Sequence, residues 1–189
     1  MSLKAVLLDF NGTVINDEDL HQQLIEQLLV EENLRPDPRE INQVCLGRSD
    51  RACIAELLQL RGRVISDGYL DQLIARKAQN YQTRMASFDA LPFYGGLDDL
   101  IYKIRSAQLK LAIVSGACRS DIDWVLARTR FQDLVSVIVS ADDLSREASK
   151  PEPDGFLLAI ERLKQQFPAL KLAPEDCLAI EDSFAGIEA

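Results

Sequence analysis

Histidine is almost missing from this sequence of 189 residues, in which His21 is the only one. The four cysteines (Cys45, Cys53, Cys118 and Cys177) include no pair with C-x-x-C spacing. Zinc sites use mainly histidine and cysteine at short spacings, so this composition argues against a zinc cage. We therefore expect all four cysteines to be reduced and mostly packing residues, as in a cytoplasmic protein.

Long apolar runs are lacking as well. No stretch approaches the ~20 residues that a membrane-spanning helix requires. The N-terminal segment MSLKAVLLDF has a short apolar stretch that ends at an acid, without the basic start and small-residue cleavage site of a signal peptide. The sequence therefore predicts neither a membrane span nor a secretion signal.

Positive charge is in deficit. The chain has 21 Lys and Arg against 30 Asp and Glu, and its net charge is −9. An acidic chain repels the phosphates of nucleic acids and anionic membrane surfaces, so neither is expected as a partner. Nothing in the sequence predicts a protein partner.

Four short apolar runs are present, each too short for a helix. They cover residues 5–8, 111–114, 137–139 and 177–180. Such runs are typical of parallel strands that helices cover on both faces. Helical periodicity in residues 121–128 and 153–166, between the later runs, predicts an α/β fold with a doubly wound parallel sheet.

The gap between the first two runs is too long for a single crossover. Apolar residues recur at helical spacing in most of it. The predicted helices cover residues 17–31, 38–46, 50–60 and 67–85. They predict a small helical cap domain, residues 16–88, inserted directly after the first strand. Residues 1–15 and 89–189 would then form a discontinuous α/β core.

Polar side chains follow the predicted strands at the point where each strand ends. Asp9 follows the first run, Ser115 the second, and Glu181 and Asp182 the fourth, while Lys150 comes a little after the third. In an open α/β sheet, ligands bind beyond the carboxyl ends of the strands. We therefore expect these side chains to meet at one edge of the sheet.

Carboxylates gathered at such an edge repel one another unless a cation holds them. Oxygen ligands without histidine or cysteine favour magnesium, which commonly pairs with substrate phosphate. Lys150 would add a second positive charge, and Ser115 would add a hydrogen-bond donor. This set could hold a phosphoryl group, and a neighbouring carboxylate could attack its phosphorus.

Four segments resemble, in order, the motifs of the haloacid dehalogenase superfamily. Residues 9–13 (DFNGT) resemble the first motif, D-x-D-G-T, with one change, and Ser115 fits the second motif. Lys150 in KPEPD fits the third, and residues 181–187 fit the fourth. The resemblance covers essentially the whole chain. Its helical insertion is similar to the α-helical cap of the β-phosphoglucomutase and phosphoglycolate phosphatase-like branch.

The resemblance implies a magnesium-dependent phosphohydrolase that acts on a small phosphorylated metabolite through an aspartyl-phosphate intermediate. Asp9 would be the nucleophile and a ligand of Mg²⁺, and Lys150 would neutralise its charge. Asp182, Glu181 and the backbone carbonyl of Asn11 would complete the metal site.

The resemblance also implies a set of residues that contact the substrate, from the core and from the cap. These are Thr13, Ser115 and Arg48, and we add as candidates Gly116, beside Ser115, and His21, on the first predicted cap helix. A solvated arginine and a helix-surface histidine are the alternatives for the two cap residues, as a solvated lysine is for Lys150. Asp182 could instead cap the helix that follows it.

Asn11 departs from the family pattern, which has a second aspartate there. That aspartate protonates the leaving alcohol and then activates water, and an amide cannot exchange a proton in this way. Its loss would raise the barrier by about 3–5 kcal/mol. Three hypotheses remain open: a native Asn11 with another proton donor such as His21, a weak catalyst, or a change engineered to trap a complex.

Two further points stay open. A phosphomutase of the β-phosphoglucomutase type shares these motifs, and a catalytically weakened phosphate-binding protein is the alternative from another class. Residues 186–189 read as the first turn of a helix. The resemblance implies that this helix continues and that at least one more strand and helix follow, so we expect a C-terminal strand and helix to be missing.

Overall fold

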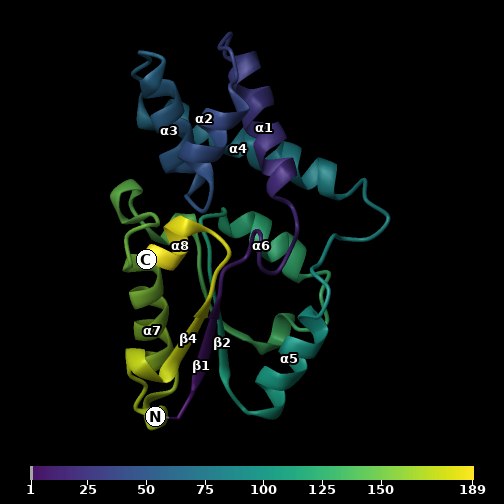
Figure 1. Ribbon diagram of the computed structural model, residues 1–189, viewed down its shortest axis with the longest axis vertical. Helices are drawn as coiled ribbons and strands as arrows, with labels where there is room; N and C mark the ends of the chain where they lie inside the picture. The colour runs from purple at the N-terminus through teal and green to yellow at the C-terminus, as the bar shows by residue number, and fades with distance from the viewer. Residues whose placement is uncertain (1) are drawn as a thin grey trace.

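A parallel sheet of four strands forms the centre of the computed structural model, which describes residues 2–189 (Figure 1). Its strands, in the spatial order β3-β2-β1-β4, are β3 (Val135–Val139), β2 (Lys110–Val114), β1 (Ala5–Leu8) and β4 (Cys177–Ile180). All neighbouring strands are parallel. The strands fall on the four apolar runs, and the predicted α/β class is confirmed.

Helices cover both faces of this sheet. Alternate residues of a strand point to opposite faces. Val6 and Leu8 of β1 pack with α5 (Leu97–Ser106) and α6 (Arg119–Leu126), whereas Leu7 faces α7 (Asp154–Gln166). The predicted doubly wound arrangement is therefore present. The short α8 (Phe184–Glu188) follows β4.

Helix α5 was not predicted, although α6 and α7 correspond to the predicted segments. Gly96, directly before α5, adopts a left-handed conformation with φ of 86°. The buried face of α5 consists of Leu97, Ile101 and Ile104, which recur at helical spacing. Single 3-10 turns complete the core at Gln132–Leu134, Ala141–Asp143, Arg146–Ala148, Pro168–Leu170 and Pro174–Asp176.

Four helices lie between β1 and α5 in the sequence and are called the insertion below. They are α1 (Glu18–Glu31), α2 (Pro38–Cys45), α3 (Asp50–Leu60) and α4 (Asp67–Met85). The helices pack on one another around a separate apolar cluster that includes Leu28, Ile54 and Leu73. Figure 1 shows the insertion above the carboxyl ends of the strands. The predicted domain limits, residues 16–88, stay a prediction.

Side-chain caps begin three of the insertion's helices. The Asp37 carboxylate accepts from the backbone N–H of Arg39 at 2.9 Å, and Ser49 and Ser66 accept in the same way at the starts of α3 and α4. Such caps stabilise a helix by about 1 kcal/mol each. No described helix is both long and apolar enough to cross a membrane.

Candidate active site

The register of the sheet brings the predicted polar residues together. Leu8 of β1 lies beside Ile113 of β2 and Ile180 of β4. The residues that follow these three positions therefore leave the sheet at the same level. Asp9 and Glu181 become neighbours in this way, although 171 positions in the sequence lie between them.

Three carboxylates form a cluster at this edge. Oxygens of Asp9, Glu181 and Asp182 all lie within 4.8 Å of one another. The buried Lys150 ammonium donates to Oδ1 of Asp9 at 2.6 Å, to the carbonyl of Val114 at 3.3 Å, and to Glu181. The structure thus brings together the predicted nucleophile Asp9, the predicted lysine and the two other carboxylates that were predicted to bind the metal.

Electrostatics in this cluster favour a cation. Burial raises the pKa of Asp9 from 3.8 to about 7; the Lys150 ammonium lowers that pKa, and the charges of Glu181 and Asp182 raise it. Burial opposes the charge on Lys150, but Asp9 and Glu181 raise the pKa of the ammonium above its ordinary value. One lysine faces three acids, and the donors are hard oxygens. This donor set fits a divalent cation such as Mg²⁺.

Gly12 allows the first-motif loop to approach Asp182. Its φ is +80°, and a Cβ at this position would lie 2.1 Å from a carboxylate oxygen of Asp182. Only glycine permits both this backbone conformation and this approach. The glycine of the first motif therefore brings the loop of β1 against the loop of β4.

Asp182 does not cap the helix that follows it. Ser183 is the capping residue of α8, and its hydroxyl accepts from the backbone N–H of Gly186 at 3.0 Å. The alternative of a capping role for Asp182 is therefore wrong, and its carboxylate is left to face the cluster. Glu18, at the start of α1, contacts Asp182 from the insertion. Burial, followed by the charge of Asp182, raises the pKa of Glu18 to about 7.

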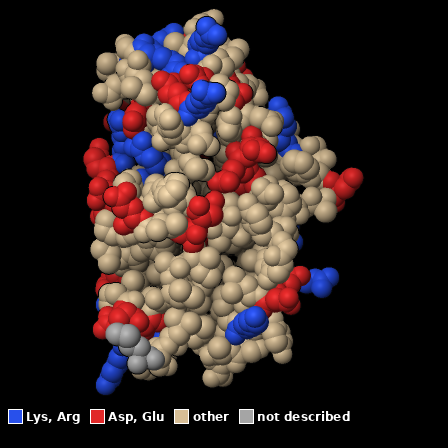
Figure 2. Space-filling model, in the orientation of Figure 1, with Lys and Arg blue, Asp and Glu red and all other residues tan. Residues whose placement is uncertain are grey.

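A cavity of about 210 Å³ separates the cluster from the insertion. Of the predicted site residues, it is lined by Asp9, Asn11, His21, Arg48, Gly116 and Asp182. Figure 2 shows acidic side chains on the surface at the level where the insertion meets the core. The lining also includes Glu18 and Asp19, so the cavity is acidic on the side of the insertion as well.

Two predicted phosphate-binding residues do not line this cavity. Ser115 is 3% exposed, and it lines a second cavity of about 20 Å³ together with Lys150. Thr13 lines neither cavity. Gly116 lines both, and a Cβ there would lie 2.9 Å from the backbone of Arg48. A glycine at this position lets the insertion pack on the end of β2.

Lys77 is a buried cation that the sequence analysis missed. Its ammonium lies 2.7 Å from Nδ1 of His21 and 2.7 Å from the Asp50 carboxylate. Lys77 follows Leu70 and Leu73 at helical spacing on the buried face of α4. A lysine at such a position signals a buried pair, because lysine is rarely fully buried without a partner.

The prediction that all four cysteines are reduced is wrong for two of them. Cys45, at the end of α2, and Cys53, in α3, form a disulfide, whereas Cys118 and Cys177 are free. The loop between the two helices turns the chain back and brings the Cα atoms to 4.8 Å. This pairing depends on that turn and not on a C-x-x-C spacing. The cysteines therefore carry no argument for a reducing compartment.

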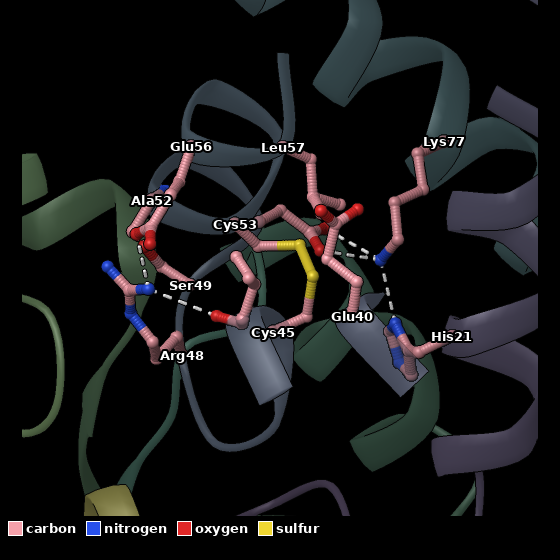
Figure 3. Close-up of a disulfide and its surroundings, with 12 residues drawn as sticks. His21, Glu40, Cys45, Arg48, Ser49, Ala52, Cys53, Glu56, Leu57 and Lys77 are labelled. Carbon is pink, nitrogen blue, oxygen red and sulfur yellow. Dashed lines mark hydrogen bonds and ion pairs between the residues drawn. A yellow bond between two sulfur atoms is a disulfide. The ribbon is translucent and has the colours of Figure 1, made fainter. Parts of the chain in front are cut away.

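The disulfide lies beside the cavity. Figure 3 shows it between Arg48 on one side and His21 with Lys77 on the other. Both cysteines line the cavity, and the loop they enclose contacts the core, where the Ser49 backbone N–H donates to Ser149 at 3.0 Å. The bond therefore restrains a loop that forms part of the cavity wall.

Reduction of this disulfide is expected to lower the free energy of unfolding by about 2–3 kcal/mol, because the bond closes a short loop of the unfolded chain. Thermal unfolding with and without a dithiol reductant measures the effect, and Cys45→Ser should reproduce it. Cys177→Ser is the control, since it should keep the full response to the reductant. Equal unfolding temperatures for the oxidised and reduced protein would contradict the prediction.

The fold and the site define an α/β protein with a lysine and three carboxylates at the carboxyl edge of its parallel sheet. The family of haloacid dehalogenase-like hydrolases matches residues 3–189, and the chain belongs to this family. The predicted resemblance is thereby confirmed.

Two relatives and one solved structure extend the match. Protein CbbY of Rhodobacter capsulatus is 30% identical over 99% of this chain and 80% of its own. Beta-phosphoglucomutase of Bacillus subtilis is 25% identical over 99% of this chain and 78% of its own. The crystal structure of CbbY from Rhodobacter sphaeroides in complex with phosphate has a TM-score of 0.80 at 21% identity, covering 98% of this chain and 80% of that one. The chain therefore has a phosphohydrolase or phosphotransferase role.

Proposed function

We propose that the chain is a magnesium-dependent phosphohydrolase that acts on a small phosphorylated metabolite through an aspartyl-phosphate intermediate. The observation that carries the proposal is the position of Asp9. Its carboxylate lies at the cavity, bonded to Lys150 at 2.6 Å and within 4.8 Å of Glu181 and Asp182. A phosphoryl group in the cavity would lie next to a nucleophile, a lysine and a cation site.

The residues of the cluster would have different roles in metal binding and charge compensation. Asp9, Asp182 and the Asn11 carbonyl would hold Mg²⁺, with Glu181 beside them. The bound ion would neutralise charge on the phosphoryl oxygens. Lys150 would balance the Asp9 charge and keep that carboxylate oriented. The insertion would act as a lid that keeps bulk water from the cavity.

The reaction would proceed in two displacements. A carboxylate oxygen of Asp9 would attack phosphorus while the P–O bond to the alcohol breaks, which forms an acyl phosphate. Water would then attack that phosphorus, and phosphate would leave with Asp9 restored. The departing alkoxide would take its proton from solvent water, because the Asn11 amide cannot supply one.

The departing group therefore decides the rate. The leaving group of an aryl phosphate is a phenolate, which is stable without a proton. The leaving group of an alkyl phosphate is an alkoxide, which has to be protonated. General acid catalysis contributes roughly 10²–10⁴-fold. We expect Mg²⁺-dependent phosphate release from p-nitrophenyl phosphate and release slower by about 10²-fold or more from glycerol phosphate.

Phosphate release from both esters, measured with Mg²⁺ and with a chelator, tests the proposal. Turnover that needs Mg²⁺ supports it. Absence of turnover for both esters, or turnover that the chelator leaves unchanged, would refute it. Exchange of phosphate between two sugar positions without release would favour the phosphomutase alternative instead.

Arg48 would help to select the substrate. Its guanidinium donates to Glu56 at 2.6 Å and to the carbonyl of Val44 at 3.0 Å. In the described chain, the other cations near the cavity are also paired: Lys150 with Asp9, and Lys77 with Asp50. A second anionic group on the substrate would have to compete with Glu56. The site thus favours a monophosphate with an uncharged remainder.

Glu56→Gln would release Arg48 from this competition. We expect kcat/KM for fructose 1,6-bisphosphate to rise about tenfold, equivalent to ~1.4 kcal/mol, and kcat/KM for fructose 6-phosphate to stay within about twofold. Glu31→Gln is the matched control, because Glu31 pairs with Arg76, an arginine of the insertion that, unlike Arg48, does not line the cavity. An equal response of the two substrates would exclude a role of Arg48 in selection.

A further inference from the structure

The Asn11 side chain has a fixed orientation in the first-motif loop. Its Nδ2 donates to Oδ2 of Asp17 at 2.9 Å and to Oδ1 at 3.1 Å. Its Oδ1 accepts from the Ser115 hydroxyl at 3.4 Å. A carboxylate only accepts, so the NH₂ group must face Asp17 and the carbonyl oxygen must face the end of β2.

Asp17 is a buried carboxylate whose close hydrogen-bond donors are neutral. It is 3% exposed, and its Oδ2 also accepts from the Tyr81 hydroxyl at 2.6 Å. Burial, followed by the Asp17 charge, raises the pKa of Tyr81, so the phenol keeps its proton and remains a donor. Nε2 of His21 lies 3.4 Å away. Asp17 precedes α1 but caps none of its N–H groups.

The same network holds His21 in place. The Lys77 ammonium can only donate, so it faces the lone pair of Nδ1 at 2.7 Å, while Nε2 on the other side of the ring lies 3.4 Å from Oδ2 of Asp17. The ring also stacks on Tyr81 with centroids 4.8 Å apart. Both ring nitrogens therefore have protein neighbours, and His21 supports the pair instead of offering a free nitrogen to the cavity.

We propose that Asn11 and Asp17 are a matched pair, in which a carboxylate at position 17 requires an amide at position 11. The pair positions the loop that carries Asp9, and it makes Asn11 a native part of this site. Its effect on turnover rests on the proposed function, whereas its effect on folding does not.

A carboxylate at position 11 would conflict with Asp17. Asn11→Asp removes the two N–H donors and places two carboxylates about 3 Å apart in a buried region, where like charges repel strongly. Adding Asp17→Asn to the same chain restores the hydrogen bond with the groups exchanged: the amide at position 17 then donates to the carboxylate at position 11. The two substitutions should therefore be strongly non-additive.

A double-mutant cycle tests the pair in the full chain with Asn11→Asp, Asp17→Asn and the double variant. We expect Asn11→Asp alone to lower the unfolding temperature by roughly 5 °C or more, and the double variant to recover most of the loss. Asn16→Asp is the matched control, because it adds the same charge to an exposed neighbour and should leave the unfolding temperature nearly unchanged. A single variant that does not fold, beside a double variant that does, also supports the pair.

Turnover gives a readout that a purely structural role would not move. With Mg²⁺ and glycerol phosphate, we expect kcat to rise by roughly 10²-fold in the double variant only, since only that chain holds an oriented acid at position 11. KM should stay within about threefold. If none of the variants releases phosphate but unfolding remains non-additive, the proposed function fails and the pair stands.

Two results would overturn the pair. One is additive unfolding, with Asn11→Asp as stable as the parent chain. The other is the full rise in kcat in Asn11→Asp alone, because a carboxylate at position 17 would then not require an amide at position 11.

Discussion

Asp9→Asn is expected to remove Mg²⁺-dependent phosphate release by a factor on the order of 10⁴ or more, as loss of a nucleophile does in other enzymes. The amide retains the size of the side chain but cannot form an acyl phosphate. The fold should persist, because Lys150 keeps its contact with Glu181 and one of three repelling carboxylates is removed. Release from p-nitrophenyl phosphate measures the loss, and thermal unfolding confirms that the variant is folded.

Asp123→Asn is the matched control for this prediction. Asp123 is half exposed and pairs with Arg119 on α6, away from the cluster. Its substitution should leave phosphate release within about twofold, since exposed pairs contribute little. A folded Asp9→Asn variant that keeps a tenth of the parent activity would show that another group attacks phosphorus.

The four strands and their polar ends could be predicted because a buried parallel strand leaves a strong local signal. An unbroken apolar run specifies the strand, and the carboxyl-edge rule for α/β sheets then locates Asp9, Glu181 and Asp182 without any long-range information. The register of β1 with β2 and β4 confirms the reasoning. The same rule does not locate Lys150, because this residue does not directly follow a strand. Only the resemblance of its segment to a known motif indicated a role for it.

The contacts around Asn11 could not be predicted in the same way. Loop residues have no periodicity that tells where a side chain points, so nothing local showed that the amide faces Asp17. The contact of His21 with Lys77 was also out of reach, because Lys77 comes from α4, 56 positions further along the chain. The disulfide of Cys45 and Cys53 likewise depends on how a loop turns between two helices.

Lys150→Met is expected to lower the unfolding temperature in the absence of metal by roughly 6 °C or more. Removing one partner of a buried ion pair costs about 3–5 kcal/mol. Lys150 is the cation that touches both Asp9 and Glu181. Its loss leaves the cluster, including Asp182, without a compensating charge in contact. Mg²⁺ should then raise the unfolding temperature of Lys150→Met more than that of the parent chain, because ligands that bind only the folded state stabilise it.

The pH dependence separates this cause from a simple loss of packing. The pKa of Asp9 in the folded, metal-free chain is about 7, above its ordinary 3.8, because of burial, with Lys150 lowering it and Glu181 and Asp182 raising it. The folded state therefore binds the proton more tightly than the unfolded state. This contribution is fully present below pH 3.8 and is lost as the pH rises through about 7.

Removing Lys150 takes away the group that lowers this pKa, so the loss of stability with rising pH should be steeper in Lys150→Met. The benefit from Mg²⁺ should accordingly be larger at pH 8 than at pH 5. Unfolding temperatures of both chains at the two pH values, with and without Mg²⁺, measure this. Lys103→Met, at an exposed position of α5, is the control and should show none of these effects. Equal gains from Mg²⁺ in the parent chain and Lys150→Met at both pH values would mean that the metal does not bind at the carboxylate cluster.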